Sequence, residues 1–253
     1  MKNKLYGFTL AEGLIAMAIV GVIAALTIPG IVANYQTQSY LTGLKKAYAD
    51  LQQNLSIMQA DNYRIKRLNA SMLARGYVGF GNTGKTIDET AGQFLKTYYK
   101  INRDCGTDTQ PCFADAYGSI DGDGDENFSC SKGYSVLLPD STAICIVPAR
   151  TERLPNTCYP SGICLEVINT RFYPNATVYI DVNGPDLPNI GGRDMFTFNI
   201  YEDFSIDNIS PVTIKYNDAT AERNELFDNN CKTSTTGVGC FGKILNDNWQ
   251  MNY

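Results

Sequence analysis

Residues 13–33 read GLIAMAIVGVIAALTIPGIVA, an apolar run without a charged side chain. At about 1.5 Å of rise per residue, a helix of this length covers the ~30 Å hydrocarbon core of a bilayer. The run therefore predicts a membrane-spanning helix. A secretory signal peptide would have a shorter apolar core followed by a small-residue cleavage site, whereas here the small residue Gly7 precedes the run. Cleavage at Gly7 would leave the helix on the mature chain.

The flanks of this run predict its orientation. The leader MKNKLYG is short and basic, so the positive-inside rule keeps it in the cytoplasm and sends the C-terminal body across the membrane. Glu12 stands at the mouth of the run, where an unpaired carboxylate costs up to about 3 kcal/mol, less near the membrane edge. A cut after Gly7 would create an α-amino group on Phe8, one helical turn before Glu12. The amine could come from the same chain or from a neighbouring one, and in the second case the pair would align two helices.

This N-terminus closely resembles that of type IV pilins and type II secretion pseudopilins, through Gly7, Phe8-Thr9-Leu10, Glu12 and the apolar helix interrupted by Pro29. The resemblance implies cleavage after Gly7 by a prepilin peptidase, which also N-methylates Phe8. It implies that Glu12 helps to recruit and dock subunits, and that Pro29 bends the helix. Ala11 departs from the family pattern, in which Ile, Val or Leu is more usual. The resemblance covers only about the first 30 to 35 residues.

The resemblance carries expectations for partners and location. Expected partners are the peptidase, copies of this chain and other pilins, the inner-membrane assembly platform and membrane lipid. We expect a single-pass precursor in the cytoplasmic membrane and then a periplasmic or cell-surface filament. The domains would be a leader over 1–7, an assembly helix over 8–35 and a globular head over 36–253. Two alternatives stay open: a DNA-uptake pilin, and a plain membrane-anchored protein whose Glu12 reaches the lipid headgroups.

Composition argues against enzymes and nucleic-acid binders. The chain has no histidine, which excludes Ser-His and Cys-His nucleophile pairs and His-ligated zinc. The remaining carboxylates do not single out a catalytic pair, so we expect no enzymatic activity. The formal net charge of −5 disfavours nucleic acid as a partner.

The cysteines predict disulfides in an oxidising compartment, which agrees with the predicted export of the head. Without histidine a zinc site would need four thiolates at unusual spacings, and reduced buried cysteines are the alternative. Cys231 and Cys240 bracket a polar loop that one disulfide could close. Proximity alone suggests the other three pairs: Cys105–Cys112, Cys130–Cys145 and Cys158–Cys164.

The fold class predicted for the head is α+β. Leu41, Leu44, Tyr48, Leu51, Leu55 and Met58 recur at helical spacing, so the membrane helix should continue to about Gln59 with one apolar stripe. The stripe favours packing on a head over a short coiled coil. A second helix is expected to start at Thr86, in a capping box with Glu89. Short β-like runs follow from about residue 117, and an antiparallel sheet packed against the first helix is expected.

Two acidic loops raise the question of calcium. In the first loop, DGDGDENF, Asp121, Asp123 and Asp125 alternate, but Glu126 occupies the position of the EF-hand glycine and Lys132 that of its closing glutamate. The second loop, from 181 to 194, offers Asp181, Asn183 and Asp194 between turn-forming Gly and Pro residues. We expect no cofactor. A solvated acidic turn is favoured for the first loop and a fixed structural loop for the second, with structural calcium as the alternative for both.

Overall fold

The computed structural model describes residues 9–61, 88–122, 124–148, 157–158, 164–165, 174–201, 204–209 and 218–253. Contacts divide the chain into two compact units, 1–39 and 40–253. Helix α1 (Leu10–Asp61) contributes its first half to one unit and its second half to the other. The continuous helix predicted from the sequence is therefore present.

The first half of α1 is apolar on all sides, and its large apolar side chains are exposed. Leu10 is 85% exposed and Leu26 is 78% exposed. So much unburied apolar surface on a soluble protein would be unusual, and it indicates a surrounding of lipid or of other helices. Pro29 lies inside the helix and supplies no backbone N–H donor there.

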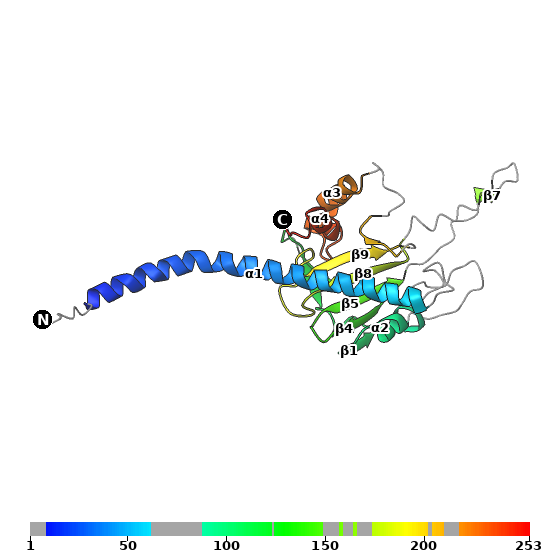
Figure 1. Ribbon diagram of the computed structural model, residues 1–253, viewed down its shortest axis with the longest axis horizontal. Coiled ribbons are helices and arrows are strands. Elements are labelled where there is room, and N and C mark those ends of the chain that lie inside the picture. The colour runs from blue at the N-terminus through cyan, green and yellow to red at the C-terminus, as the bar shows by residue number, and fades with distance from the viewer. Residues whose placement is uncertain are drawn as a thin grey trace. The chain divides into compact units, whose positions relative to one another are not determined.

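The second half of α1 buries the predicted stripe. Leu44, Leu51 and Leu55 have at most 1% of their surface exposed. Tyr48 is only partly buried, and its ring lies 5.2 Å from that of Trp249 and 5.5 Å from that of Phe241. This half of α1 (cyan in Figure 1) packs on the central sheet and forms one layer of an α+β head.

The central sheet has six antiparallel strands in the order β1-β4-β5-β8-β9-β10. Alternation along each strand assigns its side chains to two faces. Ile144 of β5 and Val178 of β8 join the core beneath α1, while their neighbours Cys145 and Tyr179 join a second cluster on the opposite face. The strands are β1 (Arg103–Gly106), β4 (Tyr134–Leu137), β5 (Ala143–Pro148), β8 (Ala176–Asp181), β9 (Met195–Ile200) and β10 (Ile206–Asp207).

Two smaller ribbons and five short helical elements complete the described head. The ribbons pair β2 (Ala116–Gly118) with β3 (Asp125–Asn127) and β6 (Thr157–Cys158) with β7 (Cys164–Leu165). The π-helix η2 (Asp88–Gly92) leads into α2 (Gln93–Tyr98). Helix α3 (Ala219–Asn230), the 3-10 turn η4 (Cys231–Thr233) and α4 (Cys240–Asn246) form the C-terminal part. The predicted second helix is thus present as η2 and α2, while its cap at Thr86 lies outside the described residues.

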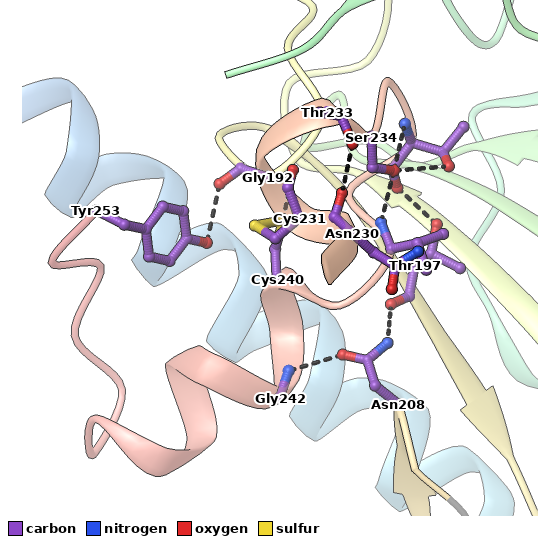
Figure 2. The surroundings of a disulfide bond; sticks show 12 residues. Gly192, Thr197, Asn208, Asn230, Cys231, Thr233, Ser234, Cys240, Gly242 and Tyr253 are labelled. Atoms are coloured by element: carbon purple, nitrogen blue, oxygen red, sulfur yellow. Dashed lines mark hydrogen bonds between the residues drawn. A yellow bond between two sulfur atoms is a disulfide. The ribbon is translucent and has the colours of Figure 1, made fainter. Parts of the chain in front are cut away.

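Three predicted disulfides are present: Cys105–Cys112, Cys130–Cys145 and Cys231–Cys240. The register of β6 and β7 places Cys158 opposite Cys164, but their side chains lie outside the described part of the chain. Figure 2 shows the Cys231–Cys240 bond beside Gly192, whose carbonyl accepts a 3.0 Å hydrogen bond from the Tyr253 hydroxyl. The C-terminal loop is therefore fastened to the turn before β9.

Substitution of Gly192 by alanine tests whether the chain packs tightly around this residue. Its φ is +83°, and an added Cβ would lie 2.6 Å from Cys240 Sγ and 2.8 Å from Ile120 Cδ1. Gly122 has nearly the same φ, +79°, but open space where a Cβ would be. Both Gly→Ala variants carry the left-handed backbone cost of about 1–2 kcal/mol, and only Gly192→Ala adds overpacking of about 1–3 kcal/mol. Urea unfolding of the full chain in detergent should rank Gly192→Ala well below Gly122→Ala, and equal losses would contradict this packing.

Candidate functional site

The first turn of α1 contains a reciprocal hydrogen-bonded pair, Thr9 and Glu12. The backbone N–H and the hydroxyl of Thr9 donate to Glu12 Oε2 at 2.9 and 2.8 Å, and the Glu12 N–H donates to Thr9 Oγ1 at 3.3 Å. This is a capping box, in which Thr9 precedes the first helical residue, Leu10, and Glu12 is the third. Both Thr9 donors bind Oε2, so Oε1 of Glu12 receives no hydrogen bond from Thr9.

Thr9 is a site residue that the sequence-based predictions omitted, although its signal is present in the sequence. The pattern Ser/Thr-x-x-Glu before an apolar run is the signature of such a box, and Thr9-Leu10-Ala11-Glu12 fits it. The Glu12 carboxylate therefore caps the start of its own helix, in addition to any contact that it makes with another chain. It satisfies a backbone N–H at the start of the helix and lies near the positive end of the helix dipole.

The other residues predicted to act in this region are Pro29, Gly7 and Phe8. Pro29 lies within α1, which is long enough and apolar enough to cross a membrane by length and composition. Gly7 and Phe8, the predicted cleavage and methylation residues, lie outside the described residues. Their assignment rests on sequence.

A family model described as the prokaryotic N-terminal methylation motif matches residues 2–28. The chain carries a prepilin motif. The match spans Gly7, Phe8 and Glu12 and ends one residue before Pro29. This is the motif of type IV pilins and pseudopilins, and it implies processing by a prepilin peptidase and assembly with other pilins. No curated protein and no solved structure matches the chain.

In the head, the second acidic loop forms a hydrogen-bonded cap between the end of β8 and the start of β9. Asp194 accepts from the N–H groups of Asn189 and Ile190 at 2.8 and 2.6 Å. Asp181 accepts from the Asn183 N–H at 3.1 Å and from the Tyr117 hydroxyl. Both carboxylates are fully buried. Their oxygens are thus engaged by protein donors, as expected of a fixed structural loop.

The first acidic loop lies beside the second. Gly118 of β2 forms a parallel bridge with Ile190, which brings the β2–β3 ribbon next to the 181–194 loop. Asp121 and Asp125 are exposed, and Asp123 lies outside the described residues. Among the described residues, no group of three acidic or cysteine side chains could hold a metal ion. Structural calcium therefore stays the alternative to the prediction of no cofactor, and a calcium-dependent rise in melting temperature would support it.

The pair Asp181 and Asp194 should make stability depend on pH. Burial, reinforced by the charge of Asp194, raises the pKa of Asp181 well above its usual value. Burial also raises the pKa of Asp194, although N–H groups of the loop lower it in part. Among the described residues, Tyr117 and Tyr40 interact electrostatically with both carboxylates, and Arg193 interacts with Tyr40. Because the folded head binds protons more tightly than the unfolded chain, the free energy of unfolding should fall as pH rises above about 4.

Asp181→Asn should reduce this slope, since the side chain keeps its size but cannot ionise. The free energy of unfolding is measured by urea denaturation at several pH values from about 4 to 7. Asp186→Asn is the matched control, because Asp186 is exposed in the same loop. A slope unchanged by Asp181→Asn would show that this carboxylate is ionised throughout the range.

Proposed function

We propose that this chain is a structural subunit, a pilin or pseudopilin, of a type IV pilus-like or type II secretion filament. It would be cut after Gly7 and would assemble through the first half of α1. The observation that carries the proposal is the Thr9–Glu12 box at the start of an exposed apolar helix, within residues that match the prepilin motif. Such a helix needs neighbours or lipid along its whole surface.

The geometry supports a specific docking contact. The box fixes one oxygen of Glu12, Oε2, and leaves Oε1 for a further donor. Cleavage after Gly7 would supply that donor as the cationic amine of Phe8 on a neighbouring subunit. In low dielectric, neutralisation of these two charges favours one register of the helices over others. Thr9 would thus orient the carboxylate, and Glu12 would bind the incoming amine.

The remaining assignments follow from the same proposal. The leader 1–7 would stay in the cytoplasm, the segment 8–35 would span the membrane before assembly, and the head 36–253 would fold outside the cytoplasm. The three disulfides support an oxidising location for the head. The work of the chain would then be assembly rather than catalysis.

Recovery of the protein in filaments tests this proposal. Cells that overproduce the full chain are sheared, and sheared material and membranes are separated and probed with antibody against the head. We expect the chain in the sheared material, together with a ladder of multiples after chemical cross-linking. Confinement to membranes as an uncross-linked monomer would favour a plain membrane anchor.

A further inference from the structure

The sequence contains several Asn-x-Ser/Thr sequons, the acceptor pattern for N-glycosylation. Their asparagines are Asn54, Asn69, Asn127, Asn175 and Asn208. A sequon is used only where the asparagine amide and the hydroxyl two residues later are accessible together. Backbone geometry and exposure therefore distinguish the sequons that could accept a glycan from those that could not.

Three of the sequons are poor acceptors. Asn54 lies on α1, where residues two apart do not face the same side, and its Ser56 hydroxyl donates to the Gln52 carbonyl at 2.9 Å. Asn175 is only 5% exposed. The amide of Asn208 donates to the Thr197 carbonyl and accepts from the Gly242 N–H, as Figure 2 shows. Asn69 lies outside the described residues.

Asn127 differs because it ends the exposed strand β3. The ladder continues one residue further, since the Phe128 N–H donates to the Asp115 carbonyl at 3.1 Å. Along this extended stretch Asn127 is exposed, Phe128 is buried and Ser129 is exposed. Strand alternation therefore presents the Asn127 amide and the Ser129 hydroxyl on one solvent-facing side.

The surroundings fix this presentation. The Phe128 ring lies 4.9 Å from that of Phe113 and 5.4 Å from that of Tyr179, within the second core cluster. One residue past the sequon, Cys130 is buried in its disulfide with Cys145. Two residues before Asn127, Asp125 is exposed and shares its strand parity, which adds an acidic group to the same side.

We propose that Asn127 is an N-glycan acceptor, modified by a membrane oligosaccharyltransferase from a polyprenyl-diphosphate-linked oligosaccharide. Asn127 Nδ2 forms a bond to the anomeric carbon of the first sugar, and the bond from that carbon to the diphosphate oxygen breaks. The lipid diphosphate leaves with the electron pair, and the amide gives one proton to a base of the transferase. A glycan here would project from an exposed ribbon and leave the buried Phe128 in place.

This inference rests on the proposed extracytoplasmic location of the head, where such lipid-linked donors are used. The test uses full-length protein from membranes of the cells that naturally produce it. Peptides containing residue 127 are analysed by mass spectrometry for wild type, Asn127→Gln, Ser129→Ala and Ser129→Thr. Ser129→Thr is the matched control, because it keeps the hydroxyl that the sequon requires.

We expect a sugar mass on Asn127 in wild type and in Ser129→Thr, and its complete loss in Asn127→Gln and Ser129→Ala. Non-reducing mapping of Cys130–Cys145 in the same samples reports export and folding independently. An unmodified Asn127 in wild-type chains with this disulfide formed would overturn the glycosylation proposal alone. Unmodified Asn127 together with reduced cysteines would overturn both this proposal and the extracytoplasmic location.

Discussion

Glu12→Gln is expected to leave the precursor inserted and the head folded but to remove the chain from filaments. Glutamine keeps nearly the same shape and can still accept the hydrogen bonds from Thr9, so the start of α1 should change little. What it lacks is the charge that would neutralise the Phe8 amine of a neighbour. Removal of one partner from a buried ion pair commonly costs about 3–5 kcal/mol, against about 0–1 kcal/mol for an exposed pair.

That loss corresponds to an assembly constant lower by about two to nearly four orders of magnitude. The amounts of wild type and variant in sheared material are compared at equal expression, with the three head disulfides mapped in both. Asp228→Asn is the charge-matched control, since Asp228 is exposed on α3 and the substitution changes the net charge equally. If Glu12→Gln assembled as well as Asp228→Asn, Glu12 would act only as a local helix cap.

Gly7→Arg is expected to stop processing altogether. A bulky charged residue at the cleavage position should prevent the peptidase from binding and cutting the chain there, whereas Gly7→Ala changes the size of the residue only slightly. The uncut chain would keep its basic leader and would not expose the Phe8 amine, so it should accumulate in the membrane at full length. Gly13→Ala is the control within the matched motif, because a Cβ at Gly13 meets no atom within 4 Å.

Electrophoresis of the membrane fraction distinguishes the two lengths. We expect only the longer species for Gly7→Arg, and the shorter species for wild type and Gly13→Ala. A shorter species of wild-type abundance in Gly7→Arg would place the cleavage site elsewhere.

The features that the sequence predicted correctly are those with strong periodic or local signals. The apolar run and the stripe from Leu41 to Met58 predicted α1. Short β-like runs predicted the strands that the structure shows as β4, β5, β8 and β9. The sequence did not predict helix α3 because most of its residues are polar and Phe227 is its one buried residue, so it lacks an apolar stripe. Asp218 could have indicated where it starts, since its side chain caps the N–H groups of Thr220 and Ala221.

Long-range polar contacts could not be read from spacing. Tyr117 and Asp181 are 64 residues apart, and only the folded ribbon beside the sheet brings the hydroxyl to the carboxylate. The acidic residues of the two loops looked alike in sequence. The structure separates them, because Asp181 and Asp194 are buried and engaged by protein donors while Asp121 and Asp125 are exposed.

The N-terminal peptide of subunits recovered from sheared filaments tests the central claim most directly. Mass spectrometry of this peptide reports processing, methylation and filament membership in one sample. The account predicts a chain that begins at Phe8 and carries a methyl group on its amine, with the Met1 form confined to membranes. Filament-associated chains that begin at Met1, or filaments that lack this chain, would contradict it.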